Sequence, residues 1–247
     1  MFDGGMIETI TMKSFSPEII LALDLDDRGK IHQVLQKTGD RLSWVKIGLQ
    51  SYLRDGPSLV EEIADSGKKV FLDLKLHDIP NTMEKALESL SKLPVGLLTL
   101  HACAGPEALE RCAHFARETM PGVILLGVTV LTSTNQAGLE AVGVHSQVDD
   151  QVLRLASLAV DRGIGGIVCS PLELPRLRLA LPPTTTLVTP GIRPADADAG
   201  DQKRIMTPGQ AKTAGANYLV IGRPILAAPD PRAALDSILE ELENTPG

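Results

Sequence analysis

Short apolar segments recur along this chain, and a stretch with helical signals follows each of them. The apolar segments cover residues 19–25, 43–49, 69–76, 95–102, 122–131, 165–170, 186–191 and 217–222. Continuous apolar runs with little alternation are typical of parallel strands that are covered on both faces. Each segment is therefore predicted to be a buried strand.

Helix signals lie between these strands. Pro57 follows a glycine and predicts the start of one helix, and Gly67 predicts its end. The pair Thr207-Pro208 has the pattern of an N-cap residue followed by proline at the first helical position. Repeated alternation of strand and helix predicts an α/β fold, a (β/α)8 TIM barrel that forms a single domain over residues 18–247, after an N-terminal tail of residues 1–17. A doubly wound open sheet has the same periodicity and remains the alternative.

Two connections are longer than is usual between a strand and a helix. One runs from Thr132 to about Gln147, and the other runs from Ile192 to Thr207. Long loops in compact domains often bind ligands or act as lids. In a barrel both would lie at the carboxyl ends of the strands, where the chemistry of such folds is found.

Composition excludes several classes of protein. The chain has 247 residues, a hydrophobic fraction of 43% and a net charge of −7 without a basic run, which argues against a nucleic-acid partner. Its longest apolar run, Val123–Leu131, is much shorter than the roughly 20 residues of a membrane span, and residues 1–16 do not resemble a signal peptide. Three cysteines without a C-x-x-C motif fit a reducing compartment. We therefore expect a cytoplasmic protein with no membrane partner.

The most informative segment is Asp73–Thr82, which follows an apolar run directly. It places Asp73, Lys75 and Asp78 at the spacing D-x-K-x-x-D. Residues i and i+2 of a strand point to the same face, so Asp73 and Lys75 should share one face, with Asp78 just beyond in a turn. Burying three charges costs desolvation energy, and folding alone gives no reason to place them together.

Charged residues also occur in the first two predicted strands. Asp24 ends the first strand and Lys46 lies inside an apolar second strand. A single charge of this kind is usually a solvated strand end. Four charges of alternating sign on neighbouring strands, Asp24, Lys46, Asp73 and Lys75, predict a shared active site instead.

The last two predicted strands each end in glycine close to an arginine. These are Gly191 with Arg193, and Gly222 with Arg223. Glycine allows close approach of a ligand, arginine binds phosphate with two hydrogen bonds, and barrels often bind phosphate after strands seven and eight. A phosphate site is predicted here, with a pair of surface arginines as the alternative.

Five other residues with reactive side chains are not assigned to chemistry. His77 and His101 lie near strand ends without metal-ligand company, so we interpret them as packing groups. The cysteines Cys103, Cys112 and Cys169 are predicted to be small buried residues. No metal site is expected.

Together these motifs resemble the orotidine 5'-phosphate decarboxylase family over nearly the whole chain, from about Glu18 to Leu242. The segments that carry the resemblance are Leu23-Asp24, Val45–Gly48, Phe71–Thr82, Leu131–Ser133, Thr189–Pro194, Gly200–Arg204 and Ile221–Pro224. The third segment is highly specific, and the set in this order is close to diagnostic.

The resemblance implies a cofactor-free homodimer that converts orotidine 5'-phosphate to UMP and CO2, with active sites shared between subunits. By resemblance, Lys75 is the proton donor and Lys46, Asp73 and Lys75 form a charge network, to which Asp78 of the other subunit contributes. The implied substrate contacts are Asp24 and Thr82 for the ribose, Thr132 or its neighbour Ser133 for the pyrimidine, and Arg193, Gln202, Gly222 and Arg223 for the phosphate.

Two alternatives remain open. The related 3-keto-L-gulonate 6-phosphate decarboxylases and hexulose phosphate synthases share D-x-K-x-x-D but use magnesium, for which an acidic residue is expected on the second strand. Lys46 at that place disfavours a metal. A barrel that only binds phosphate is the other alternative, but a pure binder has no need for Lys75 between two aspartates.

Overall fold

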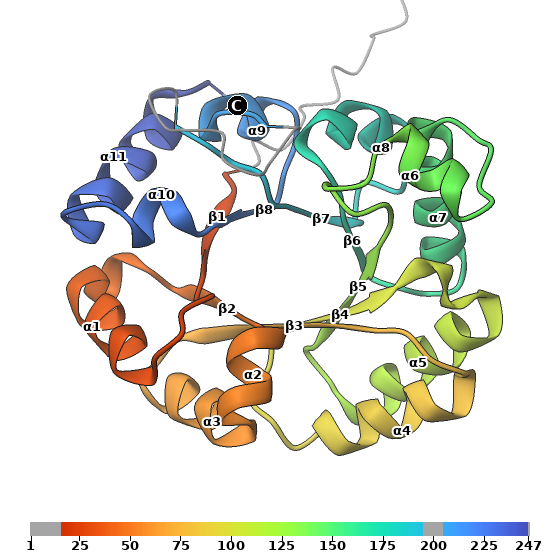
Figure 1. Ribbon diagram of the computed structural model, residues 1–247, viewed down its shortest axis with the longest axis horizontal. Coiled ribbons are helices and arrows are strands. Elements are labelled where there is room, and N and C mark those ends of the chain that lie inside the picture. Colours follow the sequence, from red (N-terminus) through yellow and green to blue (C-terminus); the bar gives the residue numbers. More distant parts are fainter. Residues whose placement is uncertain (1–15, 195–204, 247) are drawn as a thin grey trace, which may run out of the picture.

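The computed structural model describes residues 16–194 and 205–246. Within these residues, eight parallel strands close into a barrel in the order of the sequence (Figure 1). The strands are β1 Glu18–Ala22, β2 Trp44–Gly48, β3 Lys69–Leu76, β4 Leu97–His101, β5 Ile124–Val128, β6 Gly166–Val168, β7 Thr186–Thr189 and β8 Tyr218–Ile221. Because β1 pairs with β8, the sheet has no free edge, which confirms the predicted barrel and rules out the open sheet.

Helices surround the strands on the outside of the barrel (Figure 1). They are α1 Arg28–Thr38, α2 Leu49–Asp55, α3 Pro57–Asp65, α4 Pro80–Leu90, α5 Pro106–Thr119, α6 Gln136–Ala141, α7 Val148–Asp161, α8 Leu174–Ala180, α9 Pro208–Thr213, α10 Arg223–Leu226 and α11 Pro231–Asn244, with 3-10 turns at Gly39–Arg41, Ala102–Ala104 and Pro171–Glu173. Pro57 opens α3 as predicted. Thr207 caps α9, because its side chain accepts a hydrogen bond from the Gln210 backbone while the Gln210 side chain accepts one from the Thr207 backbone.

The structure describes the first of the two long connections in full and the second only in part. The connection from Thr132 to Gln147 contains the short helix α6, which begins because the Asn135 side chain accepts a hydrogen bond from the Gly138 backbone. The middle of the second connection, residues 195–204, is not among the residues that the structure describes. The same holds for residues 1–15, so the N-terminal tail stays a prediction.

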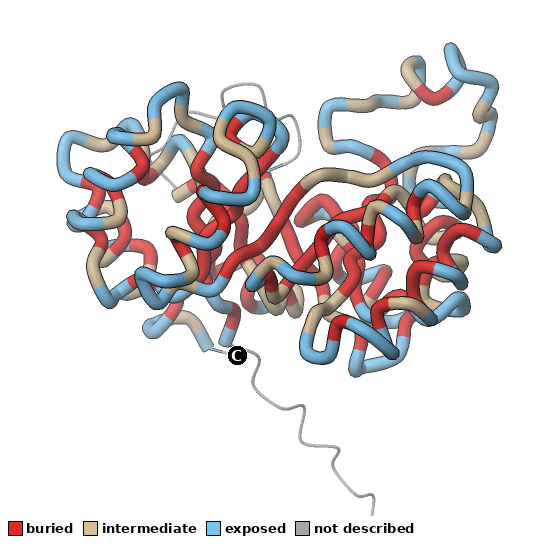
Figure 2. The backbone as a smooth tube through the Cα atoms, turned by 90° about the horizontal axis from the view of Figure 1, so that it is seen from below, coloured by how far each residue is buried: buried red, intermediate tan, exposed pale blue. Residues whose placement is uncertain are grey.

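The core has two layers, because successive residues of each strand point alternately into the barrel and out toward the helices. The outer layer joins strands to helices, and the strands are accordingly the most buried part of the chain (Figure 2). The barrel interior is filled by Ile20, Ala22, Trp44, Phe71, Leu97, Leu126, Val188 and Val220. Large apolar side chains therefore close the barrel below its mouth.

The same alternation carries polar residues to the mouth. Lys46 follows the inward-facing Trp44 by two positions, and Asp73 follows the inward-facing Phe71 by two positions. Both are buried, each with 8% of its surface exposed. The strand period thus places a cation and an anion above the apolar plug, at the carboxyl ends of neighbouring strands.

The described helices include none that is both long and apolar enough to cross a lipid bilayer.

Candidate active site

Four charged side chains meet at the mouth of the barrel, one from the segment just after β1 and three from β2 and β3. The Lys75 ammonium donates to both oxygens of Asp73, at 2.8 and 2.7 Å, and Lys46 Nζ lies 3.6 Å from Asp73 Oδ2. Lys46 also donates to the two oxygens of Asp24, at 2.9 and 3.2 Å. The structure therefore brings Asp24, Lys46, Asp73 and Lys75 together as a chain of alternating charge.

Asp73 is the centre of this network. Burial alone would raise the pKa of its carboxyl group, but the charges of Lys46 and Lys75, with hydrogen bonds from Lys75 and Thr99, bring the pKa below its usual value. Asp73 is therefore a carboxylate at neutral pH, held between two cations in a site shielded from water.

A cavity of about 190 Å³ opens directly above the network. Its walls come from the strand ends and from the connection after β5. It is lined by Lys46, Phe71, Asp73, Lys75, Val128, Val130, Leu131, Thr132, Val168, Cys169, Pro190 and Val220. The cavity lining thus combines charged side chains with apolar ones, and Thr132 is part of it.

Two residues that were not singled out from the sequence also shape the site. Gly48 ends β2 where a Cβ atom would lie only 2.8 Å from Asp24 Oδ1 and 2.9 Å from Lys46 Nζ, so a side chain there would disturb that ion pair. Thr99 is buried in β4 and its hydroxyl donates to Asp73 Oδ1 at 3.0 Å. The signal for Thr99 was present: it is a polar residue inside an apolar strand, two positions after the inward-facing Leu97.

Asp78 and Thr82 lie away from the network within their own chain. Both are exposed, on the turn after β3 and in the first turn of α4. The Asp78 carboxylate accepts a hydrogen bond from the Ile79 backbone at 2.7 Å, and the Ile79 side chain between them is 66% exposed. This segment therefore presents two polar side chains and one apolar side chain outward.

Three of the four residues expected to bind phosphate lie just after the last two strands. Arg193 follows β7 and is buried, with one guanidinium nitrogen donating to the Ile192 carbonyl at 2.8 Å. Gly222 precedes α10, and Arg223 begins this helix with an exposed side chain. Gln202 falls in the segment that the structure does not describe, so its position stays a prediction.

The histidines interpreted as packing groups lie next to each other beside this site. The rings of His77 and His101 are 5.5 Å apart. Burial is the main cause that lowers the pKa of His101, and the neighbouring His77 and Lys75 lower it further. His101 is therefore mainly neutral at pH 7. Among the described residues, His, Cys, Asp and Glu side chains form no group of three that could hold a metal ion.

The cysteines are only partly as expected. Cys112 and Cys169 are buried, and burial raises the pKa of the Cys112 thiol to about 11. Cys103 is exposed, so the prediction was wrong for this residue. The reason is its position in the 3-10 turn after β4, because turns run over the protein surface.

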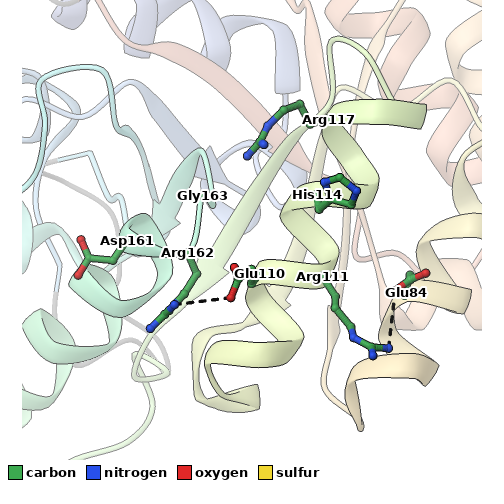
Figure 3. A pocket seen from close by; sticks show the side chains of 8 residues that line it. All are labelled: Glu84, Glu110, Arg111, His114, Arg117, Asp161, Arg162 and Gly163. Carbon is green, nitrogen blue, oxygen red and sulfur yellow. Dashed lines mark ion pairs between the residues drawn. The ribbon is translucent and has the colours of Figure 1, made fainter.

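A larger hollow of about 520 Å³ is lined by residues of α4, α5 and α7 and of the link from α7 to β6, on the outside of the barrel (Figure 3). It is lined by Glu84, Glu110, Arg111, His114, Arg117, Asp161, Arg162 and Gly163. Ion pairs join Arg162 to Glu110 at 3.5 Å and Arg111 to Glu84 at 3.9 Å, so its opposite charges largely satisfy one another. None of the predicted site residues lines this hollow, which leaves the barrel mouth as the candidate active site.

Known proteins with similar sequences and structures point to one family. The family described as "Orotidine 5'-phosphate decarboxylase / HUMPS family" matches residues 17–238. The chain is 53% identical to the orotidine 5'-phosphate decarboxylase of Opitutus terrae, over 92% of this chain and 99% of that protein. It is 45% identical to the enzyme of the same name from Methylobacterium sp., over 96% and 99%.

The crystal structure of orotidine 5'-phosphate decarboxylase from Lactobacillus acidophilus superposes on this structure with a TM-score of 0.81 and 35% sequence identity. The match covers 92% of this chain and 99% of that one. These matches confirm the family that the motifs predict. This chain is a member of the orotidine 5'-phosphate decarboxylase family of (β/α)8-barrel enzymes.

Proposed function

We propose that this protein decarboxylates orotidine 5'-phosphate to UMP and CO2, the last step of de novo pyrimidine biosynthesis. The observation that carries this proposal is the Lys75 ammonium bonded to the buried Asp73 carboxylate on one side of the cavity at the barrel mouth. Family membership indicates the substrate, and the charged network contains the groups that can perform the reaction.

The reaction needs electrostatic help rather than a covalent partner. When the bond between C6 of the pyrimidine and its carboxylate breaks, CO2 leaves and the electron pair stays on C6. No adjacent carbonyl or imine delocalises that pair. An ammonium held where negative charge develops stabilises it and then delivers the proton to C6. Lys75 performs both tasks in this proposal, and solvent returns its proton after the product leaves.

Asp73 and Lys46 prepare the site for that step. Asp73 holds the Lys75 ammonium, and it faces the substrate carboxylate before CO2 leaves. Lys46 balances the charge of Asp73 and of Asp24, so the site keeps two cations and two anions before the substrate binds. A preorganised network of this kind costs little reorganisation at the moment of reaction.

Three groups of residues bind the rest of the substrate in this proposal. Asp24, which is half-exposed beside Lys46, binds the ribose hydroxyls. Thr132 on the cavity wall, or its neighbour Ser133, binds the pyrimidine. Arg193, Gln202, Gly222 and Arg223 bind the phosphate, and the described members of this set follow the last two strands. Binding energy from the remote phosphate can order the site around the reacting carbon.

We further propose that two copies of the chain form a homodimer with shared active sites. The outward turn after β3 supports this, because Asp78 and Thr82 are exposed and flank the exposed Ile79. In the dimer, Asp78 joins the charge network of the partner subunit and Thr82 contacts the partner's bound ribose.

The proposed reaction uses neither metal nor cofactor. The magnesium-dependent members of related enzyme groups would need an acidic residue where Lys46 lies, and the Lys46 ammonium instead occupies the space between Asp24 and Asp73. A barrel that only binds phosphate is disfavoured. Burying Asp73 with two lysines costs desolvation energy, and phosphate binding does not need this group of charges. A cytoplasmic location fits the three free cysteines.

A turnover assay tests the function. Purified protein is given orotidine 5'-phosphate, and UMP formation is followed with and without EDTA. We expect equal rates in both conditions. Loss of activity in EDTA that magnesium restores would favour the metal-dependent alternative, and binding without turnover would favour the non-catalytic barrel.

A further inference from the structure

Thr99 occupies an unusual place in the barrel. It lies in β4, is 0% exposed, and faces the stretch of β3 that carries the charge network. Leu72 pairs with Leu98 and Leu76 pairs with Leu100, so β3 advances four residues while β4 advances two. Thr99 is the β4 residue opposite this bulge, which contains Asp73, Leu74 and Lys75.

The Thr99 hydroxyl joins two parts of the network. Its oxygen accepts a hydrogen bond from the Lys75 backbone N–H at 2.9 Å, and it donates to Asp73 Oδ1 at 3.0 Å. The direction of both bonds is determined, because an N–H only donates and a carboxylate only accepts. A single hydroxyl therefore replaces the ladder hydrogen bond that the bulge breaks and also holds the carboxylate that binds Lys75 Nζ.

The backbone of Lys75 needs such support. Its φ angle is 51°, and among the described residues other than glycine it is the one with a positive φ. This left-handed conformation is uncommon for a long side chain and persists only where its surroundings determine it. The hydrogen bond from Lys75 N–H to Thr99 is such a constraint at the residue itself.

We propose that Thr99 is a positioning residue for the decarboxylation: its hydroxyl holds the left-handed backbone of Lys75 and the Asp73 carboxylate together, and so sets the place of the Lys75 ammonium. This inference rests on the proposed function. Thr99 does not line the cavity, so it acts through Lys75 and Asp73 and not on the substrate.

Two matched pairs of side chains isolate the hydroxyl. Threonine and valine have nearly the same shape, and alanine differs from serine only by the missing hydroxyl. Thr99→Val and Thr99→Ala should lower kcat by about 100-fold, because a displacement of about 1 Å in a catalytic group costs that much, while KM changes little. Thr99→Ser keeps the hydroxyl and should stay within a few-fold of the unsubstituted protein.

A control separates positioning from stability. Thr38 is also 0% exposed, and its hydroxyl donates to the Val34 carbonyl at 3.0 Å. It ends α1, at the end of the barrel away from the strand carboxyl termini. Thr38→Val removes a buried hydroxyl too, and it should lower the melting temperature without changing kcat.

The pH dependence of kcat/KM distinguishes a positioning role from a purely structural one, because a purely structural role would leave it unchanged. The groups that face the Asp73 carboxylate are Lys46 from β2, Lys75 from its own strand, and Thr99 and the ring of His101 from β4. Loss of the Thr99 hydrogen bond removes a stabiliser of the carboxylate. The acidic limb of kcat/KM should therefore move to higher pH in Thr99→Val and stay in place in Thr99→Ser and Thr38→Val.

Crystal structures of the unsubstituted protein and of Thr99→Val complete the test without using activity. We expect the Lys75 φ angle or the distance from Lys75 Nζ to Asp73 to change in the variant. The proposal is overturned if Thr99→Val and Thr99→Ala keep normal turnover, if Thr99→Ser loses as much as Thr99→Val, or if Lys75 and Asp73 do not move. If the unsubstituted protein shows no turnover, the proposed function fails, and these structures still decide the positioning role.

Discussion

Lys75 places its ammonium 2.8 and 2.7 Å from the two carboxylate oxygens of Asp73, although its own backbone is left-handed at φ 51°. In a regular strand, residues two apart share a face without any such distortion. Here the contact is made within the stretch of β3 where the register against β4 shifts. The distortion is concentrated at the residue to which we assign the proton transfer.

Replacing Lys75 should abolish most of the activity. Lys75→Ala removes both the charge that stabilises the carbanion and the proton that quenches it, so turnover should fall by several orders of magnitude. The variant should remain folded, as judged by its thermal unfolding followed by circular dichroism. Turnover is measured as UMP formed per active site.

Lys69→Ala provides the matched control for Lys75. Lys69 lies at the start of the same strand, 5.4 Å from the centre of the Trp44 ring and away from the barrel mouth. Its loss should leave turnover unchanged. If Lys75→Ala kept more than about a tenth of normal turnover, Lys75 could not be the proton donor.

Ionisation of Asp73 should make the free energy of unfolding depend on pH in the acid range. The neighbouring Lys46 and Lys75 hold the pKa of Asp73 in the folded protein below its usual value, so the unfolded chain takes up a proton first as the pH falls. The contribution of the ionised Asp73 is complete above about pH 5 and is lost as the pH falls below about 4. Free energies of unfolding from urea titrations at several pH values measure this loss.

Asp73→Asn is the reference for that measurement, since it cannot titrate. Other aspartates with lowered pKa values, such as Asp26 and Asp236, are present in both proteins and cancel in the comparison. The stability difference between the two proteins should shrink toward acid pH. A difference that stays constant from pH 7 to pH 3 would mean that the pKa of Asp73 is not lowered by folding.

Arg223 should recognise the phosphate group. Arg223→Ala should weaken binding of UMP by about 10- to 100-fold, the usual cost of a lost hydrogen bond to a charged group, and should leave binding of uridine nearly unchanged. Titration calorimetry with both ligands measures the two affinities. Arg117→Ala, on the outer wall of the barrel, is the control and should change neither. Equal weakening of UMP and uridine would remove the assignment.

Asp78 should act in the partner's active site. Asp78→Ala and Lys75→Ala would each inactivate a homodimer, but a mixed dimer has one intact site and one site with both changes. Random exchange of equal amounts makes about half of the dimers mixed, so activity should recover to roughly a quarter of normal. Native mass spectrometry confirms the exchange. No recovery in a mixture that has exchanged would mean that Asp78 acts within its own chain.

The order of strands and helices could be predicted from the sequence, because the signals are local. Apolar runs mark each strand, and prolines such as Pro57 and Pro208 mark the first residues of helices. The strand period also predicts that Lys46 and Asp73 face the same interior, since each follows an inward-facing aromatic residue by two positions. Eight such units favour a barrel but fit an open sheet too, and the pairing of β1 with β8 confirms the barrel.

Tertiary structure alone decided how the charges are held. The bulge in β3 depends on its pairing with β4, twenty-odd residues later, and no local pattern reports a shift in register between two strands. The left-handed Lys75 and its support by Thr99 follow from that pairing. Likewise, the outward direction of Asp78 and the burial of Arg193 depend on which segments pack beside them. The sequence predicted which residues carry the chemistry, and contacts between distant strands determined the geometry of those that the structure describes.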